Sequence, residues 1–459
     1  MGKIKEYDVV VVGSGAGAIV VEYALSEGLK VGWVDKGPLG GTCLNVGCIP
    51  TKILVAPADR VVEIQEARKL GIEAEIRQVD FGAIMERMRR MVGEERRPIR
   101  EGIGLAQNLD FYETEAHFVA KYTLQAGRQK IRGKQIFLAS GARPFIPPIV
   151  GMGKVRYLTN ASVLELRERP ASLAIIGGGY IAAEFGHFFA AMGTRVTIVQ
   201  RNERLVPEEE PELSALLKKK MAERMDVYTG TEVVEVKGAD QGYQVLGRDV
   251  HTGENREFTA EQILLAAGRQ SNADLLKVEQ GGIETDERGY VQVNEYLETN
   301  VEHVWAFGDA IGKHMFRHSA NREAGVAWHN SVHDHKAPMD YRAVPHAVFS
   351  HPEIASVGLT QEQAEQEFDV LVGTAKYLDV ARGQAMIETD GFAKAIVEKG
   401  SGKILGFHVI GPYASILIQE VIDAMANGGN ARWVTQGMHI HPALPELVVS
   451  TLYNLHEPG

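Results

Sequence analysis

Cysteine is almost absent from this chain. Among 459 residues there are two cysteines, Cys43 and Cys48, and both lie in the stretch GGTCLNVGCIPTK. So few thiols exclude a scaffold held by several disulfides. No CxxC pair occurs anywhere, so the spacing typical of a structural zinc site is missing and we predict no metal site. An isolated close pair favours redox or catalytic chemistry over a structural staple.

Long apolar runs are also absent. No stretch approaches the roughly 18 uninterrupted apolar residues of a membrane-spanning helix, so we expect no membrane association. The apolar start YDVVVVGSGAGAIVVEYAL is interrupted by glycines and no cleavage-type ending follows it, which argues against a signal peptide. We therefore expect a cytoplasmic protein.

A basic surplus is missing as well. The formal net charge is -11 and the sequence pI is near 5.8, which argues against nucleic acid as a partner. The apolar fraction of 45% and the charged fraction of 24% are typical of a soluble globular protein, and the length favours about three domains.

One strand, glycine turn and helix pattern occurs twice. An apolar strand at residues 8–12 precedes GSGAGA, and the strand SLAII precedes GGGYIA. The first two signature glycines permit a tight turn and close approach of a pyrophosphate, and a small third residue lets the helix pack on the strand. Two copies predict an α/β fold with two dinucleotide sites. Their signature residues are Gly13, Gly15 and Ala18, and Gly177, Gly179 and Ala182.

The two copies differ where adenosine specificity is decided. Asp35 ends the second strand of the first copy, where a carboxylate can hydrogen-bond a ribose hydroxyl, which suits FAD or NAD. Gln200 holds the equivalent place in the second copy, and Arg201 and Arg204 follow it. A neutral residue with neighbouring guanidinium groups favours the 2′-phosphate of NADP over NAD, although surface arginines also follow strands without such a role.

The spacing of the cysteines limits their geometry. Residues five apart in a regular helix have Cα atoms about 8.7 Å apart, whereas a disulfide needs about 4.4 to 6.8 Å. Cys43 and Cys48 can therefore join only where the backbone leaves ideal helical geometry. Gly47 gives the chain freedom to do so.

Later segments supply further landmarks. The strands IFLASGARP and ILLAAGR end near Gly141 and Gly268, and VWAFGDA places Asp309 after an apolar strand. From about residue 338 strands alternate with two helices, which indicates a separate C-terminal domain. Within it, HPALPE supplies a base, His441, and five residues on a carboxylate, Glu446, that can fix the tautomer of the imidazole.

These motifs together resemble the FAD-dependent pyridine nucleotide-disulfide oxidoreductases, the family of glutathione reductase and dihydrolipoyl dehydrogenase, over essentially the whole chain. The runs GRQSNADLL, GSGKILGFHVIG and MHIHPALPELV most resemble mycothione reductase and its relatives. The resemblance implies two nucleotide-binding three-layer α/β domains and a C-terminal α+β dimerisation domain. We place the FAD-binding domain at 1–147 and 271–337, the NAD(P)-binding domain at 148–270 and the dimerisation domain at 338–459.

The resemblance also implies roles for individual residues. Cys43 would exchange with substrate and Cys48 would lie against the flavin. Lys52 would lie near the isoalloxazine, paired with Glu184, and Asp309 would hold the ribityl chain. The remaining residues expected at the cofactors are Thr42, Ala116, Gly141 and Gly268.

The resemblance finally implies a homodimer with shared active sites, in which His441 serves the dithiol of the other subunit. NADPH, or less favourably NADH, would reduce a small-molecule disulfide through FAD. Dihydrolipoyl dehydrogenase is the alternative, but Gln200, Arg201 and Ala182 stand where NAD-dependent members usually have an acidic residue and a third glycine. A non-catalytic flavoprotein is disfavoured because the site residues are intact. The sequence does not identify the physiological disulfide, the direction of flux or a larger complex.

Overall fold

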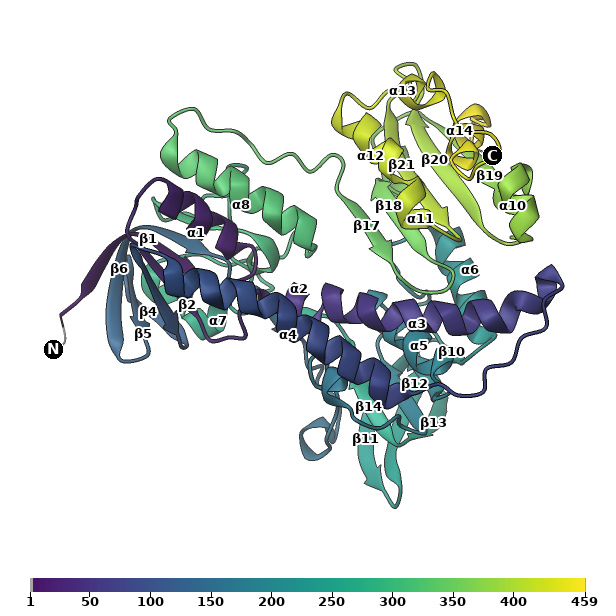
Figure 1. Ribbon diagram of the computed structural model, residues 1–459, viewed down its shortest axis with the longest axis horizontal. Helices are drawn as coiled ribbons and strands as arrows, with labels where there is room; N and C mark the ends of the chain where they lie inside the picture. The colour runs from purple at the N-terminus through teal and green to yellow at the C-terminus, as the bar shows by residue number, and fades with distance from the viewer. Residues whose placement is uncertain (1–2, 459) are drawn as a thin grey trace. The chain divides into compact units, whose positions relative to one another are not determined.

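The computed structural model describes residues 3–458. The chain forms two compact units, each assembled from segments that are far apart in sequence (Figure 1). Unit 1 contains Met1–Pro50, Glu86–Phe145 and Gly268–Asp340. Unit 2 contains Thr51–Met85, Ile146–Ala267 and Tyr341–Gly459.

Unit 1 is built on one seven-stranded sheet. Strand β1 (Lys5–Val12) ends in the buried apolar run VVVV, which is expected of a strand covered on both faces. Helices α1 (Gly17–Ser26) and α8 (Arg317–Val332) pack against each other beside the sheet (Figure 1). The order is β3 (Leu109–Glu113), β2 (Val31–Asp35), β1 (Lys5–Val12), β6 (Gln129–Leu138), β5 (Thr123–Ala126) and β4 (Ala116–Ala120), with β16 (Val304–Ala306) parallel to β6.

Unit 2 contains a second parallel sheet, which carries the second glycine signature. The expected strands SLAII and RVTIV are found residue for residue as β8 (Ser172–Ile176) and β9 (Arg195–Val199). Helix α5 (Tyr180–Ala191) joins them, and α6 (Pro211–Ala222) follows β9. The sheet order is β10 (Asp226–Tyr228), β9, β8 and β14 (Gln262–Leu265), beside a three-stranded antiparallel sheet of β11 (Thr231–Ala239), β12 (Gly242–Asp249) and β13 (Asn255–Ala260).

The C-terminal part of unit 2 is a five-stranded antiparallel sheet covered by short helices. Phe407 and Tyr377 are fully buried in its core. Helix α14 (Glu446–Tyr453) packs on β19 (Val370–Lys376) and β20 (Phe392–Glu398). The order is β17 (Pro345–Val348), β18 (Ile354–Gly358), β21 (Ile404–Ile410), β20 (Phe392–Glu398) and β19 (Val370–Lys376). The predicted fold class, two nucleotide-binding α/β sheets and a C-terminal α+β domain, is confirmed.

The other elements connect these sheets. Helices α2 (Gly41–Val46) and α3 (Cys48–Glu66) contain the cysteines. The remaining elements are α4 (Phe81–Leu105), β7 (Ala142–Pro144), β15 (Arg269–Ser271), α7 (Ala273–Leu276), α9 (Gln361–Glu365), α10 (Ala381–Met386), α11 (Ala414–Leu417), α12 (Gln419–Ala426) and α13 (Arg432–Thr435).

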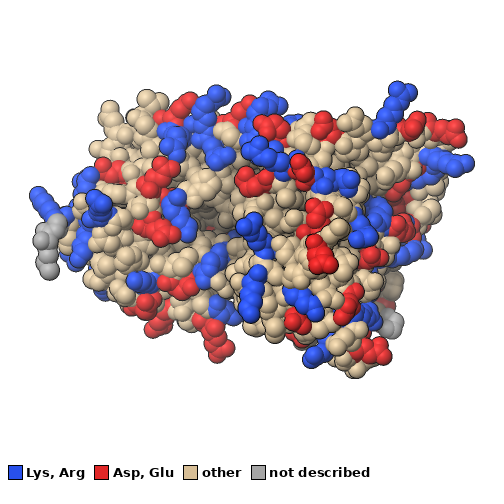
Figure 2. All heavy atoms as spheres, turned by 90° about the horizontal axis from the view of Figure 1, so that it is seen from below, with Lys and Arg blue, Asp and Glu red and all other residues tan. Residues whose placement is uncertain are grey.

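The surface carries charges of both signs. Figure 2 shows basic and acidic side chains interspersed over the face that it draws. Within residues 3–458, none of the helices combines the length and the apolar character needed to cross a bilayer.

Candidate active site

The first glycine of each signature sits in a turn that admits no side chain. Gly13 and Gly177 have φ of +104° and +117°. A Cβ on Gly13 would lie 2.1 Å from the carbonyl oxygen of Ala139, and one on Gly177 would lie 2.2 Å from that of Ala266. Both turns therefore require glycine, as the signature predicts.

The later signature residues differ between the copies. Nothing lies within 4 Å of a Cβ placed on Gly179, so its backbone faces open space that a pyrophosphate can enter. Ala182 is fully buried, as expected for close packing of helix on strand. In the first copy Gly17 also allows the helix to pack closely on the strand, because a Cβ there would lie 3.0 Å from Val11 Cγ1. Ala18 is half-buried, and its packing role stays a prediction.

The strand ends that follow carry different polar groups. The carboxylate of Asp35 accepts hydrogen bonds from the N–H groups of Ser14 (2.5 Å) and Gly37 (2.7 Å), so it fixes the glycine turn from which a ribose would be reached. In unit 2, Arg201 is exposed and Arg204 is half-buried. Neither guanidinium forms an ion pair with any residue of the described chain, so both are available to an anionic ligand.

Unit 1 also contains polar groups that fit a flavin dinucleotide. Asp309 follows β16 and lies with its Oδ2 3.3 Å from Nε of Arg269. Burial raises the pKa of the Asp309 carboxyl, and the charge of Arg269 opposes this shift only in part. The buried hydroxyls of Ser140 and Ser319 have no hydrogen-bond partner among residues 3–458. Such under-partnered groups suit a ligand that brings hydroxyls and phosphates.

The other expected cofactor residues lie at turns and element ends. Thr42 lies on α2, and Ala116 begins β4, opposite Ala126. Gly141 has φ +67° and Gly268 has φ +113°, and the Gly268 carbonyl accepts a hydrogen bond from the N–H of Phe145. The cofactor contacts expected of these four residues stay predictions.

The two cysteines flank a break between helices. Helix α2 ends at Val46 and α3 begins at Cys48, with Gly47 between them at φ -138° and ψ -117°. A departure of this kind is what the spacing of the cysteines requires if they are to join. A Cβ on Gly47 would lie 3.0 Å from the Thr42 oxygen and 3.4 Å from Cys43 Cα, so glycine allows the close approach.

Both cysteines are in the thiol form, and they share a hydrogen bond. This bond to Cys48, together with burial, raises the pKa of Cys43, while the charge of Arg317 lowers it. Cys48 is the first residue of the 19-residue helix α3, whose N-terminus favours negative charge. The helix N-terminus thus favours a negative charge at Cys48, whereas the pKa of Cys43 is raised.

Unit 2 contains the expected pair of Lys52 and Glu184. The Lys52 ammonium donates to both carboxylate oxygens, at 2.7 and 2.9 Å, and Glu184 is buried at the start of α5. Phe349 supports this pair twice, since its ring lies 4.2 Å from Lys52 Nζ and its N–H donates to Glu184. Sequence reasoning missed Phe349, which no motif marks.

The C-terminal base has the predicted orienting partner. His441 Nδ1 lies 2.9 Å from Glu446 Oε1, and the N–H of Ala443 donates to the other carboxylate oxygen. These two bonds lower the pKa of Glu446. Nε2 of His441 is thus left for chemistry, on a side chain that is 74% exposed. His439 instead pairs with Glu420 and is largely enclosed.

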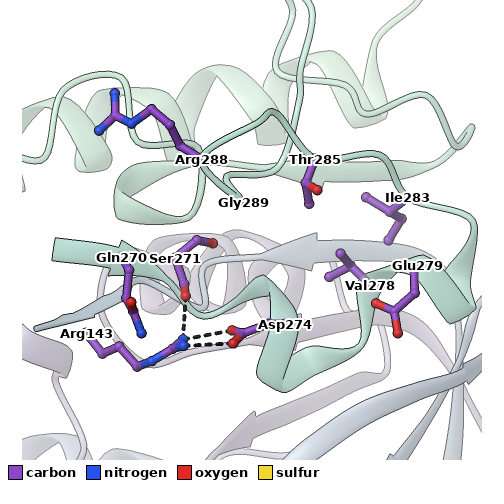
Figure 3. Close-up of a pocket in the computed structure, with 10 residues that line it drawn as sticks. All are labelled: Arg143, Gln270, Ser271, Asp274, Val278, Glu279, Ile283, Thr285, Arg288 and Gly289. Atoms are coloured by element: carbon purple, nitrogen blue, oxygen red, sulfur yellow. Dashed lines mark hydrogen bonds and ion pairs between the residues drawn. The ribbon is translucent and has the colours of Figure 1, made fainter. Parts of the chain in front are cut away.

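One polar cavity of unit 1 does not coincide with any of these groups. A cavity of about 300 Å³ borders β7 and β15 (Figure 3). Its most prominent cation, Arg143, is already held by both carboxylate oxygens of Asp274, at 2.8 and 2.7 Å, and by the Ser271 carbonyl. None of the predicted site residues lines it, so we assign the chemistry to the cysteines.

The chain matches two family descriptions over most of its length. Residues 7–324 match the pyridine nucleotide-disulphide oxidoreductase family, and residues 344–452 match the dimerisation domain of that family. The chain belongs to this family. It is accordingly an NAD(P)H-dependent disulfide oxidoreductase, a flavoprotein of the glutathione reductase type with a redox-active cysteine pair.

Individual relatives align over nearly the whole chain. Mycothione reductase of Mycobacterium tuberculosis is 36% identical over 98% of this chain and 100% of its own. Dihydrolipoyl dehydrogenase of Geobacillus stearothermophilus is 34% identical over 97% and 95%. The flavoprotein disulfide reductase RclA of Escherichia coli, in its Cu(II) complex, superposes with a TM-score of 0.87 at 27% identity over 98% and 99%. The family implies FAD and a pyridine nucleotide as cofactors.

Proposed function

We propose that this enzyme passes electrons from NADPH, through FAD and the Cys43–Cys48 pair, to a small-molecule disulfide similar to mycothione. The observation that carries the choice of NADPH is that Arg201 and Arg204, which follow Gln200 after β9, form no ion pair within residues 3–458. Two guanidinium groups without carboxylate partners suit a 2′-phosphate. The similarity to mycothione reductase supports the class of substrate.

FAD, when bound, would supply transfer of an electron pair from the pyridine nucleotide to the Cys43–Cys48 disulfide. Cys43 then gives its proton to Nε2 of the His441 that serves the site and attacks one sulfur of the substrate disulfide as a thiolate. A mixed disulfide forms on Cys43 and the first substrate thiolate leaves. Cys48 attacks Cys43 Sγ, which releases the second substrate thiolate and restores the disulfide. Two electrons leave the protein, and each departing thiolate requires one proton.

His441 supplies protons to the departing thiolates. Its Nδ1 is fixed by Glu446, so Nε2 is the atom that gives and takes the proton. The enzyme is a homodimer in which His441 of one subunit serves the dithiol of the other. In support, the segment around His441 exposes Met438 fully and Ile440 by 78%, an apolar surface that a second copy would cover.

Steady-state kinetics with NADPH and NADH test the cofactor. We expect kcat/KM to favour NADPH by at least about tenfold, which corresponds to about 1.4 kcal/mol, and Arg201→Glu to remove much of that preference. Arg195→Glu is the matched control, because Arg195 is an exposed arginine at the opposite end of β9. The substrate panel comprises oxidised mycothiol, glutathione, bis-γ-glutamylcystine and lipoamide.

Dihydrolipoyl dehydrogenase is the alternative function. A strong NADH preference together with rapid oxidation of dihydrolipoamide would establish it and overturn the present proposal. Equal use of both nucleotides would remove the role assigned to Arg201 and Arg204.

A further inference from the structure

The loop that carries Arg201 and Arg204 is held at its far end by buried charges. It runs from Gln200, after β9, to Glu210, which precedes α6. Glu209 and Glu210 are adjacent in sequence, and their side chains are 0% and 1% exposed. Full burial of two consecutive carboxylates destabilises the fold unless each is paired with a cation or a hydrogen-bond donor. The NADPH chemistry proposed above does not use either residue.

Glu209 is paired with two strands of the C-terminal sheet. Its Oε1 lies 2.8 Å from Nε2 of His346 on β17, and its Oε2 accepts from the hydroxyl of Ser356 on β18. Burial raises the pKa of Glu209, but the hydrogen bond and charge of His346 outweigh it, so the net shift is downward. The carboxylate is therefore charged and firmly held.

Glu210 is bound by β20 of the same sheet and by α9. Its Oε2 lies 2.8 Å from Nζ of Lys394 on β20, and Lys394 is itself only 4% exposed. Its other oxygen accepts from the N–H of Gln361, the first residue of α9. Three strands and one helix of the C-terminal domain thus hold two residues of a loop in the nucleotide-binding domain, all within unit 2.

The middle of this loop is strained. Val206 has φ +40°, a conformation that a β-branched residue rarely adopts. Its N–H donates to the Gly178 carbonyl of the glycine signature at 2.7 Å, and its own carbonyl accepts from the N–H of Glu209. Such strain persists only when surrounding contacts over-determine the backbone. Release of Glu209 and Glu210 would let Val206 relax and would move Arg204, two residues earlier.

We infer that Glu209 and Glu210 are positioning residues for nucleotide selection, through which the C-terminal sheet fixes the loop bearing Arg201 and Arg204. This inference rests on the proposed NADPH specificity. Because the arginines address only the 2′-phosphate, loss of the anchor weakens NADPH and leaves NADH nearly unaffected.

The test compares KM and kcat for both nucleotides in the complete flavoprotein. Glu209→Gln keeps the size and the hydrogen bond to Ser356 but removes the charge that His346 faces. The double variant Lys394→Met with Glu210→Gln removes both charges together, so that neither is left buried alone. In each, we expect KM for NADPH to rise about tenfold, with kcat and the KM for NADH within about twofold of wild type.

Asp390→Asn is the matched control. Asp390 bridges Lys219 and Lys220 of α6 at 3.1 and 2.8 Å, so it links the same two domains without touching the loop. It should leave both KM values unchanged. If wild type prefers NADPH but the variants raise KM for NADPH and KM for NADH equally, the inference is overturned. It is also overturned if neither variant raises KM for NADPH. A wild-type enzyme that uses both nucleotides equally would instead refute the proposed specificity itself.

Discussion

Replacement of Gly47 by alanine tests how the chain brings its two sulfurs together. The added Cβ would lie 3.0 Å from the Thr42 oxygen and 3.4 Å from Cys43 Cα, and both neighbours are backbone atoms that cannot rotate away. Overpacking of this kind typically costs about 1 to 3 kcal/mol. Relief of the clash must push α2 away from the start of α3, which separates Cys43 from Cys48.

Separation of the two cysteines destabilises the disulfide form more than the dithiol form, because the Cα atoms of a disulfide must stay within about 6.8 Å. If the whole cost falls on the oxidised form, the reduction potential rises by up to about 60 mV, since 30 mV corresponds to about 1.4 kcal/mol for two electrons. Equilibration with glutathione redox buffers followed by thiol counting measures this potential, and urea unfolding measures the loss of stability.

Gly93→Ala is the control, because nothing lies within 4 Å of a Cβ at this exposed position in α4. It should stabilise the protein by up to about 1 kcal/mol through helix propensity and leave the potential unchanged. Should Gly47→Ala match wild type in both stability and potential, the break at Gly47 is not what brings the sulfurs together.

Two further predictions concern the division of labour in the proposed site. Cys43→Ser should abolish disulfide reduction while Cys48 still perturbs the flavin absorbance, and Cys48→Ser should lose that perturbation; the opposite pattern would invert the assignment. His441→Ala should lower turnover by about 10² to 10⁴ but spare flavin reduction by NADPH. A mixture of the His441→Ala and Cys43→Ser variants should recover roughly a quarter of wild-type activity, because half of randomly formed dimers are mixed and each mixed dimer has one intact site. Verified heterodimers without activity would rule out a site shared across the interface.

Short-range features could be predicted from the sequence. The cysteines and the pair His441 and Glu446 are each five residues apart, so local spacing was enough to predict a backbone break and an oriented base. The glycine signatures likewise fix their turns, since backbone oxygens close by exclude any side chain at Gly13. Steric restrictions on the backbone act within a few residues, so they can be predicted directly from the sequence.

Long-range contacts could not be derived in the same way. Lys52 and Glu184 are 132 residues apart, and only the family resemblance linked them. Glu209 and His346 are 137 residues apart and belong to no motif, so nothing in the sequence links them. Burial, which makes those carboxylates informative, is a property of the fold and leaves no spacing rule in the sequence.

The exposure of His441 connects assembly with chemistry in the proposed mechanism. A base that protonates a leaving thiolate works best where water cannot compete for the proton, yet this imidazole is 74% exposed and sits beside the fully exposed Met438. Its own chain therefore orients the ring through Glu446 but does not shield it. A second copy that covers this apolar segment would supply both the shielding and the dithiol, so dimerisation and catalysis would depend on the same few residues.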